Sequence, residues 1–186
     1  MNETLKSILD RRSNRGFSAQ ALTADQLKTF ADVALASPTA KNYQDWHFTF
    51  VTNREIIDAY SRNYCEIAAR DMSPEKAEKL KREYHLFFHA PLVVFITLPE
   101  NPQSRFAQVD AGIAVENLAI AAQSMGLGSV IIGRPLDVLD SPQGAEWECR
   151  LGFPQGHHFA IAIAIGNPTV TKEAHPILEN RIHFVE

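Results

Sequence analysis

The segment 105–125 restricts the fold most, because its apolar residues lie almost all the way round a helix instead of along one stripe. Gly126 follows it directly and is a typical residue for ending a helix. A helix of this kind has to be buried on most of its sides. In one small domain such a helix often forms a subunit interface, and we expect that role for this segment.

Four further runs predict strands. Three are short and continuously apolar, which is typical of strands covered on both faces: 91–98, 129–132 and 159–165. The fourth, 46–52, alternates and is rich in aromatic and β-branched residues. Helices are expected over 3–12, over 23–36 behind a capping box formed by Thr23 and Gln26, over 56–67, from 74 onward, and over 141–152. Residues 182–185 could form a last strand, and we expect residues 1–186 to form one α+β domain.

Composition excludes several classes of protein. The chain has 22 acidic and 18 basic residues, and its net charge of −4 argues against a nucleic-acid binder with a strongly basic surface. Its two cysteines, Cys65 and Cys149, form no CxxC motif, which excludes a disulfide scaffold and fits a reducing compartment. The N-terminus has no apolar signal-peptide core, and no stretch approaches 18 uninterrupted apolar residues. We therefore expect a cytoplasmic protein without nucleic-acid or membrane partners.

Three arginines gather at the end of the first predicted helix. Arg11, Arg12 and Arg15, with Ser13 among them, would make a good phosphate site, since a planar guanidinium matches phosphate oxygens. The same cluster could equally be a solvated helix C-terminus, where the helix dipole favours cations.

The segment 37–46 joins a predicted helix to a predicted strand. Its Thr39, Asn42 and Gln44 can hydrogen-bond the polar edge of a planar heterocycle. They could also satisfy their own backbone in a turn.

Other motifs give weaker signals. Gly126, Gly128 and Gly133 follow a helix and precede a strand, the reverse of the order in a dinucleotide-binding turn, so a Rossmann reading is rejected. His85 and His89 have the i, i+4 spacing of metal ligands, but no third ligand is identifiable and a helix end beside Pro91 explains them as well. His157 and His158 are expected in a turn before a strand. The sequence therefore predicts no metal site.

Taken together, four segments resemble the nitroreductase-like family of FMN-dependent flavoproteins. RRSNRGF at 11–17 is similar to the family's opening motif, and SPTAKNYQDWHF at 37–48 to its second motif. DAGIAVENLAIAAQSMGLGSVIIG at 110–133 resembles the family's long helix, glycine turn and strand. FAIAIAIGNP at 159–168 resembles its last core strand. The motifs occur in the family's order and span nearly the whole chain.

The resemblance implies an α+β fold with a central, mostly antiparallel sheet flanked by helices, in an intertwined homodimer that binds FMN at its interface. It implies hydride transfer from NADH or NADPH through flavin N5, in a ping-pong cycle, to a small acceptor such as a nitroaromatic or a quinone. The flavin is then the reactive centre, and no catalytic side chain is required. The tail 171–186 would embrace the partner chain.

The resemblance also assigns cofactor-binding residues. The phosphate and ribityl end would be held by Arg11, Arg12, Ser13 and Arg15. The flavin would be approached from the other subunit by Pro38, Thr39, Ala40, Asn42 and Gln44. The isoalloxazine ring would contact Ile131, Ile132 and Gly133.

Three departures from the family pattern stand out. Asp45 occupies the place of a usual proline, so the loop could be shaped differently. The cation that often precedes the tail's proline is missing before Pro176, which leaves Lys172 as the nearest substitute to pair with phosphate. Lys41 replaces a frequent small residue and is either a cation at the flavin's edge or a solvated loop lysine.

Other functions stay open at this point. A specialised family reaction, such as reductive dehalogenation or flavin fragmentation, would need a lid, for which 68–90 is a short candidate. A flavin-binding protein without turnover, regulatory or storage in role, would keep the same binding residues. A structural dimer would use the arginine cluster only to contact acidic partners. The sequence contains no feature that selects NADH over NADPH.

Overall fold

A computed structural model describes residues 1–170 and 172–186, and its centre is a four-stranded antiparallel sheet. The strands are β1 (His47–Val51), β2 (Leu92–Pro99), β3 (Gly128–Ile132) and β4 (His157–Gly166). Their order across the sheet is β1-β2-β4-β3, which places the two longest strands in the middle and leaves β1 and β3 as edges. All four predicted strands are therefore present, in the antiparallel sheet that we expected.

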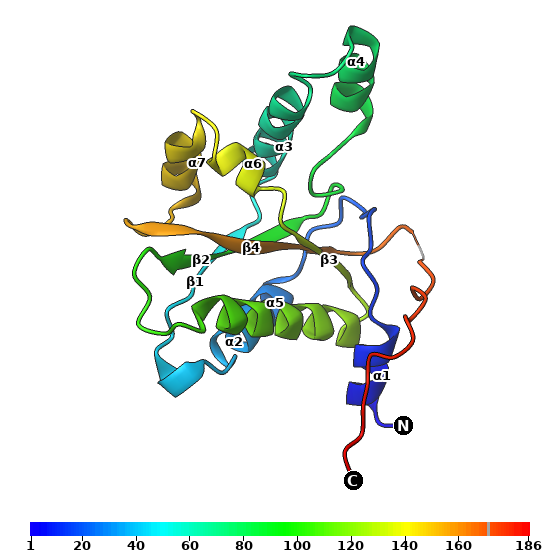
Figure 1. Cartoon of the computed structure of the whole chain (residues 1–186). Coiled ribbons are helices and arrows are strands. Elements are labelled where there is room, and N and C mark those ends of the chain that lie inside the picture. The colour runs from blue at the N-terminus through cyan, green and yellow to red at the C-terminus, as the bar shows by residue number, and fades with distance from the viewer. Residues whose placement is uncertain (171) are drawn as a thin grey trace.

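Helices cover both faces of the sheet (Figure 1), which explains why the central strands are apolar on both sides. One face carries α2 (Ala24–Leu35) and α5 (Ala107–Ser124), which pack in one apolar core. The other face carries α3 (Arg54–Ala68), α6 (Leu136–Leu139) and α7 (Gly144–Leu151), which pack in a second core. Seven residues of β2 are buried, in keeping with this double cover.

Two helices lie outside these layers. The N-terminal helix α1 (Glu3–Asp10) contacts α5, and its end leads directly into the arginine cluster. The helix α4 (Pro74–Glu83) projects away from the sheet beyond α3 (Figure 1). It accounts for much of the segment 68–90, the candidate lid.

Local signals in the sequence account for many helix ends. The capping box is present: Thr23 Oγ1 accepts from the Gln26 N–H, and the Gln26 side chain accepts from the Thr23 N–H. At the end of α7, Gly152 adopts the left-handed conformation with φ 68°, the usual glycine stop.

Other expectations were wrong. His157 and His158 do not form a turn but begin β4, where they pair with Pro99 and Leu98. The helix expected from 141 begins at Gly144, and the four-residue α6 before it was not predicted, because such a short helix leaves no periodic pattern. Residues 182–185 are not in a strand. The predicted tail segment begins at residue 171, which lies outside the described residues.

The long helix α5 keeps part of its surface open, although α1, α2 and the sheet pack against it. Ala111, Ala114 and Leu118 are buried, but Val109 is 58% exposed and Ile113 is 37% exposed. The apolar surface that the sequence placed on most sides of this helix is therefore partly open in one copy of the chain.

Candidate functional site

The segment 11–17, the arginine segment, is attached to the outer edge of β3. Ser13 forms a parallel bridge with Ser129, and the Asn14 N–H donates to the Ser129 carbonyl at 2.8 Å. The Asn14 side chain accepts from the Ser129 N–H at 3.3 Å and donates to the Val170 carbonyl at 3.2 Å. Through these bonds Asn14, which is only 8% exposed, connects β3, the arginine segment and the residue before the tail.

A glycine makes this attachment possible. A Cβ atom on Gly128 would lie 2.7 Å from Asn14 Oδ1 and 2.9 Å from the Cβ of Pro168. A side chain at this position would force Asn14 or Pro168 to shift. Sequence analysis did not identify Asn14, although it lies within the quoted motif, because its role depends on residues more than 100 positions away.

The arginine segment and the tail enclose a cavity of about 400 Å³, within the range of small-ligand sites. All four predicted phosphate residues line it, and so does Lys172, the predicted substitute cation. Among the described residues, its lining consists of Ile8, Leu9, Arg11, Arg12, Ser13, Arg15, Lys172, Glu173, Ala174, His175 and Ile177. The structure thus brings together the cations that the sequence assigned to one phosphate.

The three arginines differ in how far they are already engaged. Arg11 Nε donates to Glu116 Oε1 on α5 at 3.1 Å. Arg12 donates to the carbonyls of Leu9 and of Arg11. Arg15 is exposed and forms no side-chain hydrogen bond within the described residues. Arg15 is therefore the arginine most available to an anion.

The end of β3 continues the same edge of the sheet beyond the bridge to Ser13. Ile131 is 36% exposed, and Gly133 is exposed; apart from its two chain neighbours, no described residue has an atom within 4 Å of where its Cβ would be. Ile132 differs, because its side chain is 7% exposed and packs in the core between the sheet and α3. A ligand at this edge would meet the side chain of Ile131 and the backbone of Ile132 and Gly133.

A further arginine follows Gly133 and was not identified from the sequence. Arg134 donates to the hydroxyl of Tyr64, and its guanidinium lies 6.0 Å from the centre of that ring. Burial raises the pKa of Tyr84, whereas the nearby charges of Arg134 and Arg15 oppose that rise. Arg134 therefore lies beside the pair formed by Tyr64 and Tyr84, whose ring centres are 5.8 Å apart.

The loop predicted to meet the flavin lies elsewhere on the chain, near the start of α5. The Ala40 N–H donates to Asp110 on α5, whereas Arg11 is held by Glu116, six residues further along the same helix. At about 1.5 Å per residue, these anchors are about 9 Å apart along the axis. The approach to the loop lies nearer, because Asn117, directly after Glu116, donates to Ser37 Oγ at 3.0 Å. Among the described residues, no hydrogen bond joins the predicted loop residues to the segment 11–17 of the same chain.

Within this loop the polar side chains bond one another. Thr39 Oγ1 accepts from the Gln44 N–H at 3.1 Å, and Gln44 Nε2 donates to Asn42 Oδ1 at 2.8 Å. Asn42, Gln44 and Pro38 are exposed, and Lys41 is an exposed loop lysine. These exposed side chains are open to a flavin bound by a second copy of the chain, and their contact with that flavin stays a prediction.

The two spaced histidines belong to a polar network instead of a metal site. His85 Nε2 lies 3.0 Å from Asp58 Oδ1, and Arg54 bonds both Asp58 and the His89 carbonyl. His85 Nδ1 accepts from the N–H groups of Phe87 and His89, which requires that this nitrogen carry no proton. Burial of the ring lowers the pKa of His85, so the neutral form is favoured. Among the described residues no group of three or more His, Cys, Asp or Glu side chains is placed to hold a metal ion.

None of the described helices is long and apolar enough to cross a bilayer.

Comparisons with known proteins agree on one family. The sequence model of the nitroreductase family matches residues 8–167. The NADPH-flavin oxidoreductase of Vibrio harveyi is 28% identical over 185 residues, which cover 96% of this chain and 71% of that protein. A nitroreductase from Desulfitobacterium hafniense, solved with bound FMN, is 29% identical with a TM-score of 0.88, and one from Bacteroides fragilis, also with FMN, is 25% identical with a TM-score of 0.86. Both alignments cover 100% of each chain.

Proposed function

Because the chain belongs to the nitroreductase family, we propose that it is an FMN-dependent NAD(P)H oxidoreductase that works by a ping-pong cycle on small acceptors such as nitroaromatics or quinones. The observation that carries this proposal is the cavity in which Arg11, Arg12, Ser13, Arg15 and Lys172 meet beside the edge of β3. Two free cysteines, Cys65 and Cys149, fit the cytoplasm as its place of action.

The residues present suit FMN. A phosphate dianion needs several cationic or N–H donors, and the cavity offers three guanidiniums, one hydroxyl and one ammonium. Beside it, the backbone of Gly133 is open to a flat ligand, since no side chain fills that space. When bound, FMN supplies the redox chemistry, accepting hydride at N5 and passing electrons to the acceptor.

The chain's own residues bind and orient. Arg15, exposed and without a side-chain partner in the described part of the chain, takes the strongest part in holding the phosphate, and Arg11 assists from its place on Glu116. Ile131 provides an apolar contact at the edge of β3. Arg134, fixed by Tyr64, contributes positive charge on the same side as Arg15.

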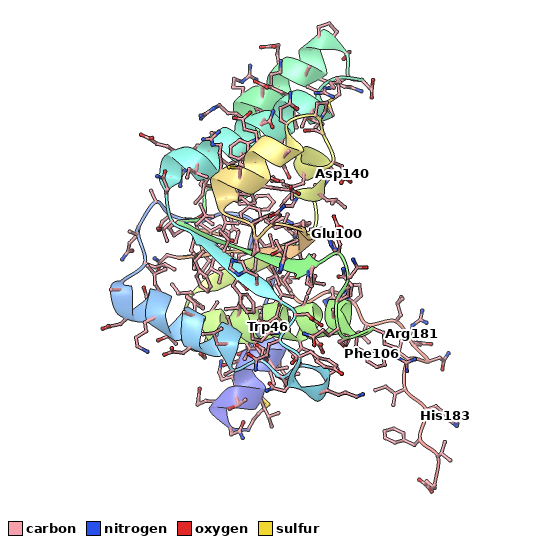
Figure 2. The ribbon with its side chains drawn as sticks, turned by 90° about the vertical axis from the view of Figure 1, so that its left-hand side faces the viewer. Trp46, Glu100, Phe106, Asp140, Arg181 and His183 are labelled. Carbon is pink, nitrogen blue, oxygen red and sulfur yellow. The ribbon has the colours of Figure 1, made fainter. Side chains whose placement is uncertain are left out.

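We propose a homodimer in which the second chain completes each site. The loop residues Pro38, Thr39, Ala40, Asn42 and Gln44 form no hydrogen bond with the segment 11–17 of their own chain within the described residues, and we assign them to the partner's site. The exposed apolar residues of α5, Val109 and Ile113, support this helix as the contact surface between two copies. The exposed tail, whose Arg181 and His183 project away from the body (Figure 2), would embrace the partner.

Reduction of the bound flavin by a nicotinamide donor tests the proposal. Purified protein incubated with FMN should be yellow, and anaerobic addition of NADH or NADPH should bleach the flavin absorbance. Added nitroaromatic or quinone should then restore it without the donor remaining bound, as a ping-pong cycle requires. Protein that stays colourless would refute the flavoprotein assignment, and absence of bleaching with either donor would favour a flavin-binding protein without turnover.

A further inference from the structure

We infer that Asp110 and Asp45 are positioning residues, which hold the loop 39–45 in the shape that meets the partner's flavin. The inference rests on the proposed function for its ligand, but the positioning itself can be tested without FMN. The backbone of this loop has an unusual conformation. Lys41, Asn42 and Gln44 have φ values of 53°, 57° and 53°, in the left-handed region that residues other than glycine seldom adopt.

Three such residues within four positions do not persist unless surrounding contacts impose the shape. The inner contact is Asp110, which is 5% exposed and belongs to the first turn of α5. Both of its carboxylate oxygens lie 3.2 Å from the Ala40 nitrogen, directly before the first left-handed residue. This bond fixes the start of the strained stretch to the rigid helix.

The outer contact is Asp45, directly after the last left-handed residue. Its two oxygens accept from the N–H groups of Gln103, at 3.2 Å, and Ser104, at 2.9 Å, in the segment that leads into α5. The strained residues thus lie between two hydrogen-bonded attachments. Asp110, in the first turn of α5, holds one end, and Asp45, bonded to the segment before α5, holds the other. Asp45, which stands in place of a usual proline, fixes this end of the loop by hydrogen bonds.

A third contact fixes the approach to the loop. Asn117, further along α5, donates to Ser37 Oγ at 3.0 Å. The same helix holds Arg11 through Glu116, so α5 sets the spacing between the loop and the arginine cavity. A flavin bound between two copies would therefore meet a loop whose position is defined by the interface helix itself.

Proteolysis tests the positioning directly, because Lys41 lies on the exposed crest of the loop and trypsin cleaves after lysine. In full-length protein without FMN, Asp110→Ala should raise the cleavage rate between Lys41 and Asn42 about tenfold or more, measured by mass spectrometry. Cleavage after the exposed Arg181 in the same digest is the internal control and should not change. Unchanged cleavage after Lys41 would overturn the inference.

FMN affinity and its rescue provide the second test, since a purely structural role for Asp110 would not produce rescue. Asp110→Ala should weaken FMN binding about tenfold or more, whereas Asp71→Ala, which removes an exposed acid, should not. Lys41→Gly relieves the backbone at one left-handed position, so the double variant should recover at least half of the lost affinity on a logarithmic scale. Failure of Lys41→Gly to restore binding would overturn the inference.

A second variant covers the case in which Asp110→Ala does not fold. Asp45→Ala removes the outer contact from a partly exposed position and should raise cleavage after Lys41 and weaken FMN binding in the same directions. Wild-type values for both quantities would refute the inference. If the wild-type chain itself bound no FMN, the proposed function would fail, but the proteolysis result would still decide whether the two carboxylates hold the loop.

Discussion

Replacing Asn14 by alanine tests how the arginine segment is attached to the sheet. The change removes the acceptor of the Ser129 N–H and the donor to the Val170 carbonyl. Ser129 is 2% exposed, so its N–H loses its side-chain partner without gaining water, at about 1–3 kcal/mol. The bond to the carbonyl of Val170, a residue that is 45% exposed, contributes about 0.5–1.5 kcal/mol.

The expected loss in the free energy of unfolding is therefore about 1.5–4.5 kcal/mol, or roughly 3–18 °C in melting temperature for a chain of this size. Urea unfolding followed by circular dichroism measures it, without FMN and at one fixed protein concentration, because both cofactor and dimerisation shift apparent stability. Asn101→Ala, in an exposed turn, is the matched control and should change stability by less than about 0.5 kcal/mol. An equally small loss for Asn14→Ala would refute the attachment.

Three further outcomes follow from the site and the interface. Arg15→Ala should weaken FMN binding about 10- to 100-fold, measured by quenching of flavin fluorescence, and unchanged affinity would remove Arg15 from the phosphate site. Burial lowers the pKa of His85, so the unfolded chain binds its proton more readily and stability should fall as pH drops below about 6.5. His85→Gln should make the urea midpoint depend less on pH. His157, whose pKa is also lowered, should account for part of the dependence that remains. A midpoint that changes with pH as steeply as in the wild type would contradict the role of His85. Gly112→Leu, on the open side of α5, should give a folded monomer by sedimentation, and a dimer would argue against α5 as the interface.

The sheet and most helices were predictable because their signals are local. The apolar run of β2 identifies a strand covered on both faces, and the Thr23–Gln26 capping box specifies a helix start within four residues. The arginine cluster was also visible, since its members are adjacent in sequence. In each case the physics that forms the feature acts between near neighbours.

What the sequence did not reveal depends on contacts between distant segments. Arg134 acquires its position from Tyr64, 70 residues earlier, and Asp110 acquires its role from Ala40 at the same separation. Ile132 was assigned to the flavin with its neighbours; because side chains alternate along a strand, its side chain lies in the core and its backbone is the part left to meet a ligand. No spacing rule in the sequence identifies such pairs or selects the face.

Anaerobic stopped-flow absorbance shows most directly whether each site holds FMN that a nicotinamide donor reduces. Protein reconstituted with one FMN per chain should lose its flavin absorbance on mixing with NADH or NADPH, at a rate that saturates with donor concentration. The absorbance should return when a quinone is added. Protein that takes up no FMN, or bound FMN that neither donor reduces, would contradict the proposed oxidoreductase function.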